Sequence, residues 1–261
     1  MFETIAYDVA DGVATIRLNR PQHHNAINSL MSRELPAVWA CFKRDPSAVV
    51  AIITAAGERA FCSGADISDL PDFSWKDGAT EPRLNWTSQQ NDVWKPVICA
   101  VNGMVVGGGL HFIADADIVI AAEHATFFDP HVRVGLVAAL EPIVLSRKIP
   151  MEAVLRMALM AGDERLTARR ALEIGLISET VAAADLPRRA LEIASSVKKN
   201  SPRAMADTKR AIWQSLELPL QEALRSGYRL IAENNKGPDF REGQRAFMER
   251  REPRWSPYVD G

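Results

Sequence analysis

The sequence lacks long hydrophobic runs, an excess of charge of one sign and any pattern of paired cysteines. No apolar run approaches the roughly 18–20 residues of a membrane-spanning helix, so no membrane partner is expected. The 31 basic and 33 acidic residues leave a formal net charge of −2 without a dense basic run, which disfavours nucleic-acid binding. Cys41, Cys62 and Cys99 are odd in number and lack metal-ligand spacing. Because the N-terminus also lacks a basic-then-apolar signal, we expect a cytoplasmic protein without a bound metal.

The residues that are present suit one globular fold with a large core. Of the 261 residues, 47% are hydrophobic and 25% are charged. Short β-prone runs such as Val49–Thr54 dominate the first half and helical periodicity dominates the second, which predicts an α/β protein. Strands are predicted over residues 4–8, 13–18, 49–54 and 97–101. Helices are predicted over residues 26–45, 151–161, 167–175, 186–200, 201–216 and 218–235. Three more helices are predicted with one end each: one that begins at residue 66, one that ends at residue 94 and one that begins at residue 141. A lid-like loop is predicted over residues 68–84, and an arginine-bearing tail begins at residue 240.

The segment from Lys95 to Gly135 carries the most informative pattern. A buried strand, Val97–Val101, is followed by three glycines, Gly107–Gly109, that lead into a segment with helical spacing. Glycine lets the backbone come close to a ligand, and the first N–H groups of a helix have no intrahelical partner and favour negative charge. The triplet is therefore a candidate site for an anion or a polarised carbonyl oxygen. His111 and His131 follow it.

A second glycine turn precedes the triplet by about 43 residues, within Phe61–Asp66. The two turns, each between a strand and a helix, resemble those of the enoyl-CoA hydratase/isomerase (crotonase) superfamily. Other segments resemble the family in the same order, so that the resemblance covers nearly the whole chain. They are Asn19–Pro21, Asn25–Asn28, Lys95–Gly103, Asp117–Ala121, Ala125–Phe128, Leu166–Ala168, Ala171–Ile177, and Glu242–Gly243 with Ala246–Phe247.

This resemblance implies an architecture and a substrate class. The fold would be a crotonase-like spiral of ββα units in residues 1–195, with a helical C-terminal region, residues 196–261, that builds homotrimers or hexamers made of two trimers. The partner would be an acyl-CoA thioester. Coenzyme A would enter as part of the substrate, and no separate cofactor is expected.

The resemblance also implies the site residues. The backbone N–H groups of Ala65 and Gly108 would form an oxyanion hole around the thioester oxygen. Two fixed amides suit the charge that develops on an enolate or tetrahedral oxygen. Arg20 and His23 are candidates for the coenzyme A phosphates, although many relatives carry basic residues where this chain has His23 and His24. The remaining candidate contacts with coenzyme A are Ser63, Gly64, Asp66 and Ile67.

The chain departs from the family at the positions that perform chemistry. Hydratases of the family hold water with two glutamates, and His111 and His131 stand at those two positions. We interpret this as altered chemistry, since an imidazole pair can act as acid and base with pKa values near neutrality. Glu141 is either a third catalytic group or a simple helix-start charge, and Asp129 either orients His131 or is a turn residue.

Several reactions are compatible with a histidine pair beside an oxyanion hole. Hydration or isomerisation of an enoyl thioester comes first, and thioester hydrolysis, hydrolysis of a carbon–carbon bond and decarboxylation are alternatives. A non-catalytic acyl-CoA-binding protein is the alternative from another class. Trp75, Trp86 and Trp94 lie in or after the predicted lid, and they indicate either a bulky apolar acyl group or core packing.

Overall fold

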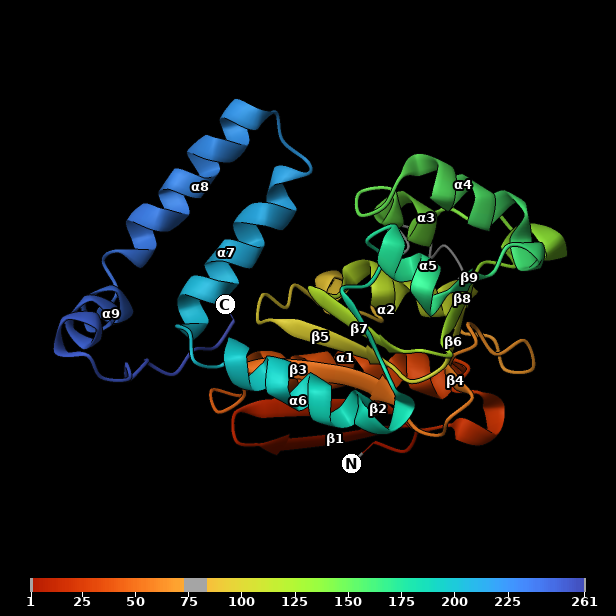
Figure 1. Ribbon diagram of the computed structural model, residues 1–261, viewed down its shortest axis with the longest axis horizontal. Coiled ribbons are helices and arrows are strands. Elements are labelled where there is room, and N and C mark those ends of the chain that lie inside the picture. Colours follow the sequence, from red (N-terminus) through yellow and green to blue (C-terminus); the bar gives the residue numbers. More distant parts are fainter. Residues whose placement is uncertain (1, 73–83, 261) are drawn as a thin grey trace.

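A computed structural model gives the structure of the protein and describes residues 2–72 and 84–260 (Figure 1). The predicted lid, with Trp75, lies largely outside these residues. The strands of the protein are β1 (Ile5–Ala10), β2 (Val13–Leu18), β3 (Val50–Ala55), β4 (Ala60–Cys62), β5 (Val97–Val101), β6 (Met104–Val106), β7 (Ile118–Ala122), β8 (Thr126–Phe128), β9 (Leu166–Thr167) and β10 (Glu179–Val181). Its helices are α1 (Ser29–Arg44), α2 (Leu110–Asp115), α3 (Leu140–Leu145), α4 (Met151–Leu159), α5 (Ala168–Glu173), α6 (Leu186–Val197), α7 (Pro202–Ser215), α8 (Leu220–Asn234) and α9 (Pro238–Glu249).

The strands form two sheets that the chain visits in turn. The larger sheet has the order β1-β2-β3-β5-β7-β10, and all its pairs are parallel except the β1–β2 hairpin. The smaller sheet has the order β4-β6-β8-β9, in which only β9 is antiparallel. Each of β3, β5 and β7 is followed by a strand of the smaller sheet, which confirms the predicted crotonase-like spiral. The glycine turns follow β4 and β6, two paired strands of the smaller sheet.

The core lies on both faces of the larger sheet. Helix α1 buries Trp39 and Phe42 against one face, where Ile16 and Ile53 of the strands meet them. Helix α6 covers the other face with an apolar stripe that includes Leu186, in front of the strands in Figure 1. Alternation of side chains along a strand lets both faces be apolar, which explains the continuous hydrophobic runs seen in the sequence.

Several predicted elements differ from the structure. Pro36 lies inside a single helix, α1. Residues 66–70 form turns instead of a helix, because Asp66 binds the backbone of Ser68. The helix predicted up to residue 94 is wrong, since that segment contains only a 3-10 turn, Gln89–Asn91, after which Asp92 adopts a left-handed conformation. The arginine-bearing tail contains α9, which begins at Pro238.

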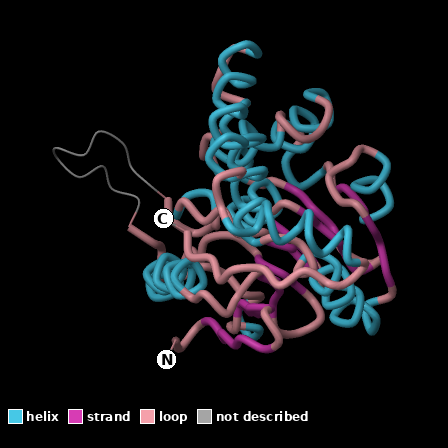
Figure 2. Tube along the Cα trace, turned by 90° about the vertical axis from the view of Figure 1, so that its left-hand side faces the viewer, coloured by secondary structure: helices cyan, strands magenta, loops and turns pink. Residues whose placement is uncertain are grey.

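The C-terminal helices α7 and α8 rise away from the sheets, as the front and side views agree (Figures 1 and 2). Helix α8 buries none of its residues and exposes Leu220, Leu224, Tyr228 and Ile231 at a helical spacing. The chain end returns to the core, where Asp260 Oδ2 accepts hydrogen bonds from the amides of Trp94 and Lys95. The predicted boundary at residue 195 falls in the last turn of α6 and stays a prediction. No helix in the described part of the chain is long and apolar enough to cross a bilayer.

Candidate active site

Two glycine turns meet where β4 and β6 end. Gly64 and Gly107 adopt left-handed φ values of +88° and +48°, which side chains disfavour. A Cβ atom on Gly109 would lie 2.7 Å from the carbonyl oxygen of Cys62, closer than a carbon can approach. The close contact of the two turns therefore requires glycine, and it fixes the relative position of the backbone amides that follow.

The amides of Ala65 and Gly108 are neighbours. A Cβ atom on Gly108 would lie 3.7 Å from the Ala65 nitrogen, and one on Gly64 would lie 3.4 Å from the Gly108 nitrogen. Ile27 forms a β-bridge with Ala65, in which the hydrogen bonds are donated by the amides of Ile27 and Asp66. The N–H group of Ala65 takes no part in this bridge. Gly108 stands in the first turn before α2, where N–H groups have no helical acceptor. Two neighbouring amides of this kind can serve as the donors of an oxyanion site.

His131 lies beside this amide pair. A Cβ atom on Gly107 would lie 3.3 Å from His131 Cε1 and 3.5 Å from its Nε2. On the other side of the ring, Nδ1 lies 2.7 Å from Oδ1 of Asp129, which is fully buried. The two atoms are close enough for an ion pair, but they are not aligned for a hydrogen bond. The other carboxylate oxygen, Asp129 Oδ2, has no hydrogen-bond partner among the described residues. The Asp129 carboxylate raises the pKa of His131 and so favours the imidazolium form.

His111 lies one helical turn after Gly108 and is only 3% exposed. Its Nε2 lies 3.2 Å from Oε1 of Glu141, a buried residue in the first turn of α3. Burial lowers the pKa of His111, although the Glu141 charge acts in the opposite direction. The two imidazoles therefore have pKa values displaced in opposite directions, so that one tends to be neutral while the other is protonated. Such a pair can serve as base and acid in one cycle.

The predicted coenzyme A segment is held by a buried ion pair. Arg20 Nη1 lies 3.0 Å from Asp66 Oδ2 and also donates a hydrogen bond to the carbonyl oxygen of Ala26. Asp66 Oδ1 accepts hydrogen bonds from the amide and hydroxyl of Ser68, which together with Arg20 lower the pKa of Asp66 to about 2. This ion pair holds the turn in place, so the largely buried Arg20 already has a structural role as the partner of Asp66. Phosphate contact by Arg20 stays a prediction.

The other predicted contacts lie along the same turn. The Ser63 amide donates a hydrogen bond to the carbonyl oxygen of His24, which ties the segment to the turn after β2. Ile67 is 90% exposed and His23 is exposed. The structure thus brings Ser63, Gly64, Asp66 and Ile67 together beside the amide pair, and it leaves His23 on the outside of the neighbouring turn.

The surroundings of His111 were not predicted from the sequence. The Trp86 ring meets the imidazole edge-on with centroids 5.7 Å apart, and a Cβ atom on Gly108 would lie 3.1 Å from that ring. Asp115, one helical turn after His111, is buried and binds the hydroxyl group of Thr87. The spacing of four residues on one helix was the available signal for Asp115. Nothing in the sequence indicated Thr87, because it comes from a segment without helical period.

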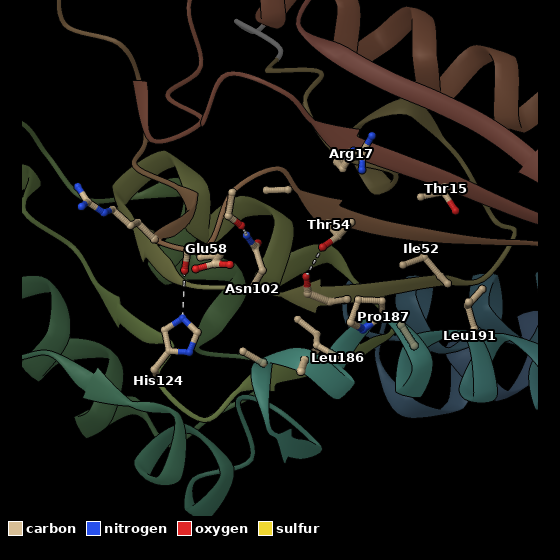
Figure 3. A pocket seen from close by; sticks show the side chains of 17 residues that line it. Thr15, Arg17, Ile52, Thr54, Glu58, Asn102, His124, Leu186, Pro187 and Leu191 are labelled. Atoms are coloured by element: carbon tan, nitrogen blue, oxygen red, sulfur yellow. Dashed lines mark hydrogen bonds between the residues drawn. The ribbon is translucent and has the colours of Figure 1, made fainter. Parts of the chain in front are cut away.

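A separate cavity of about 860 Å³ lies on the α6 side of the larger sheet (Figure 3). It is lined by Ile52, Thr54 and Leu186, and near one end His124 Nε2 lies 3.1 Å from the carbonyl oxygen of Glu58. Neither histidine–carboxylate pair nor the glycine triplet borders it. The chemistry-bearing groups gather at the glycine turns, so we place the candidate active site there and not in this cavity.

Comparison with known proteins agrees with this geometry. The sequence model of the enoyl-CoA hydratase/isomerase family matches residues 8–257. (E)-benzylidenesuccinyl-CoA hydratase of Thauera aromatica is 32% identical over 95% of this chain and 97% of its own length, and carnitinyl-CoA dehydratase of Proteus mirabilis is 33% identical over 98% and 99%. A crystal structure of an enoyl-CoA hydratase/isomerase from Mycobacterium paratuberculosis superimposes with a TM-score of 0.91 and 42% identity, and it covers 99% of this chain and 100% of the other. The chain belongs to the enoyl-CoA hydratase/isomerase family.

Proposed function

We propose that the protein processes an acyl-CoA thioester through an enolate, with Ala65 and Gly108 as the oxyanion hole and His111 and His131 as base and acid. The observation that carries the proposal is the neighbouring pair of amides beside two histidines, each in contact with a buried carboxylate. The opposite displacement of the two imidazole pKa values supports it. Relatives named as a hydratase and a dehydratase of CoA thioesters support the same reaction class.

In the hydration direction the proposed steps follow from these positions. His111, held neutral by burial, takes a proton from water as the water oxygen bonds to Cβ of the enoyl thioester. The electrons of the double bond move toward the thioester oxygen, whose charge the two amides stabilise. His131, protonated beside Asp129, gives its proton to Cα and restores the carbonyl group. His111 then releases its proton to solvent and His131 takes one up, which returns both imidazoles to their starting states. The reverse steps describe dehydration.

Each fixed amide contributes substantially to such a mechanism. Loss of one oxyanion donor typically costs about 3–4 kcal/mol of transition-state stabilisation. Gly108 supplies one donor through its backbone, and a side chain at this position would meet the Trp86 ring. A Gly108→Val variant should therefore lose turnover through blockage of the site.

Thioester hydrolysis is the second candidate function, and the Asp129–His131 pair favours it. A buried carboxylate that holds an imidazole is the arrangement that activates nucleophiles in acyl transfer. In this reaction His131 would take a proton from water as the water attacks the thioester carbonyl, and coenzyme A would leave as the thiol. The elevated pKa of His131 counts against this role at neutral pH, because the base must begin unprotonated.

Mass spectrometry of products separates the candidates. Incubation with crotonyl-CoA should give the hydrated thioester with coenzyme A still attached, whereas hydrolysis would release free coenzyme A. His111→Ala and His131→Ala should each lose turnover while retaining affinity for coenzyme A by calorimetry. If the wild type bound no CoA thioester, both candidates would be wrong. Binding without turnover would favour an acyl-CoA-binding protein.

Assembly as a trimer or a dimer of trimers is part of the proposal. The exposed apolar stripe of α8 supports it, since a helix with no buried residue needs a partner to cover Leu224 and Tyr228.

A further inference from the structure

The indole ring of Trp86 contacts two groups of the candidate site at once. A Cβ atom on Gly108 would lie 3.1 Å from Cζ3 of this ring, so the ring lies directly beside the residue that supplies one of the two amides. The same ring stands perpendicular to the imidazole of His111, with centroids 5.7 Å apart and an interplanar angle of 86°. The indole therefore lies against both the proposed base and one proposed oxyanion donor.

The ring is fixed from its other side by helix α1. Its Nε1 donates a hydrogen bond of 2.8 Å to the hydroxyl oxygen of Ser32, and the carbonyl oxygen of Trp86 accepts one of 2.8 Å from Nε1 of Trp39. The amide of Trp86 donates a hydrogen bond to Oε1 of Gln90, which holds the backbone in place. Because Trp86 is only 2% exposed and hydrogen-bonded in this way, the indole has little freedom to turn.

The residue after Trp86 holds the other end of α2. The hydroxyl group of Thr87 donates a hydrogen bond to Asp115, the last residue of that helix. Trp86 and Thr87 thus contact α2 near both of its ends. Since Trp86 is itself bound to α1, these two residues tie the helix that carries His111 to a helix of the main core.

Turnover depends on where the imidazole of His111 lies, and this step rests on the proposed function. With the thioester oxygen at the amides of Ala65 and Gly108, the imidazole has to lie within hydrogen-bond reach of the water that attacks Cβ. The substrate therefore fixes the required separation of base and donor, and a displacement of about 1 Å can lower the rate by about 100-fold. A rigid ring that touches both groups sets this separation.

Burial beside the indole also affects the protonation of His111. It lowers the pKa of His111 and so favours the neutral form that a base needs. The titratable groups that face the imidazole are Glu141 of α3, Asp115 of α2, and Asp129 and His131 after β8. The three carboxylates raise the pKa of His111, and His131 lowers it. All four remain when Trp86 is replaced, so a pKa shift in such a variant reports the change in burial.

We propose that Trp86 is a positioning residue: its indole ring holds the imidazole of His111 in a fixed orientation beside the Gly108 amide and shields it there from bulk water. Trp86 acts through His111 and not on the thioester itself. Its loss should therefore lower kcat far more than it weakens thioester binding.

Steady-state kinetics on crotonyl-CoA test this role in three variants. In Trp86→Leu we expect kcat to fall by about 10- to 100-fold, while KM and the affinity for butyryl-CoA by calorimetry change by less than about threefold. Trp86→Phe keeps an aromatic ring, and Ser32→Ala keeps the indole but removes the acceptor of its N–H group. Both should therefore lose less of kcat than Trp86→Leu.

Trp255→Leu is the matched control. Trp255 follows α9, and its Nε1 donates a hydrogen bond of 2.7 Å to the carbonyl oxygen of Lys199. The control thus removes an indole ring and its hydrogen bond away from the glycine turns. It should leave kcat and its pH profile unchanged.

NMR titration of the His111 ring protons gives a second reading that needs no turnover. The chain has five histidines, so the His111 signal can be identified by its loss in His111→Ala. Trp86→Leu opens space beside an imidazole and a backbone amide, polar groups that water can solvate. The pKa of His111 should then rise toward its ordinary value of 6.5, and the low-pH limit of kcat should rise with it.

Several outcomes would overturn the inference. They are an unchanged pKa of His111 in Trp86→Leu, an equal shift in Trp255→Leu, and a loss that appears in KM and binding while kcat is kept. If Trp86→Leu does not fold, Trp86→Phe and Ser32→Ala should show smaller changes of the same sign, and their absence would contradict the inference. A wild type that binds thioester without turnover would make the proposed function wrong. The NMR titration would then decide the role of Trp86 alone, and a raised pKa of His111 in Trp86→Leu but not in Trp255→Leu would support it.

Discussion

Replacement of Asp129 by asparagine should move the high-pH limit of activity toward lower pH. In the proposed cycle His131 must be protonated and His111 neutral, so activity lies between the two pKa values. The pKa of His111 is lowered and sets the low-pH limit, whereas the pKa of His131 is raised and sets the high-pH limit. Asp129→Asn removes the charge that raises the pKa of His131, so the imidazolium loses its proton at a lower pH.

The size of the change follows from the contact. Nδ1 and Oδ1 lie 2.7 Å apart, for which Coulomb's law gives about 1.5 kcal/mol in water and about 6 kcal/mol at an effective dielectric constant of about 20. The side chain of His131 is 24% exposed, so the effect should lie between these limits. We expect the high-pH limit of kcat to fall by roughly 1–3 pH units. The low-pH limit should fall by less, because Asp129 raises the pKa of His111 only weakly compared with that of His131.

The assay is the pH profile of kcat on the best acyl-CoA substrate, measured for wild type, Asp129→Asn and Glu141→Gln. Glu141 raises the pKa of His111, so its neutralisation should move the low-pH limit further into acid. The high-pH limit should move less, because the contact of Glu141 with His131 is the weaker one. The two variants are controls for each other, because each should move a different limit of the profile more than the other. A profile for Asp129→Asn that superimposes on wild type would refute the assigned role of His131.

Three further outcomes follow from the packing. Gly109→Ala places a carbon 2.7 Å from the Cys62 carbonyl oxygen and should lower the free energy of unfolding, measured by urea denaturation, by about 1–3 kcal/mol. Gly227→Ala is the matched control on α8, where an added Cβ atom would have no atom within 4 Å, and it should raise that free energy by up to about 1 kcal/mol. The folded pKa of Asp66 is about 2, below its ordinary 3.8, so its hydrogen bonds from Ser68 and its ion pair with Arg20 stabilise the protein above pH 3.8 and lose this effect as the pH falls toward 2. Asp66→Asn should therefore cost about 2 kcal/mol at pH 7 and little near pH 2, and equal losses at both pH values would contradict that reading. Leu224→Glu should reduce the mass measured by light scattering to that of a monomer, if α8 forms the expected interface.

The sequence predicted the fold well because its signals are local. Continuous β-branched runs mark β3 and β5, and glycines mark turns that no other residue fits, such as Gly64 and Gly109. The helix predicted before Lys95 is wrong because the side chain of Gln90 accepts hydrogen bonds from the amides of Trp86 and Thr87, a local alternative to the helical pattern.

The site was predictable only in part. Family resemblance singled out His111 and His131, but the contact between His111 and Glu141 joins residues 30 positions apart in chain order and depends on the approach of α2 to α3. Contact of Arg20 with a phosphate stays a prediction, but its buried pair with Asp66 was not predicted from the sequence. Such pairings depend on tertiary packing, which spacing along the chain does not encode.

The central claim is that this site forms an enolate from a CoA thioester. The most direct measurement is exchange of the Cα proton of butyryl-CoA with deuterated water, followed by NMR with wild type, His131→Ala and His111→Ala. We predict exchange in the wild type and its loss in His131→Ala, with thioester binding retained in all three proteins. A wild type that binds butyryl-CoA without exchanging the Cα proton, or a His131→Ala variant that exchanges it at the wild-type rate, would contradict the account.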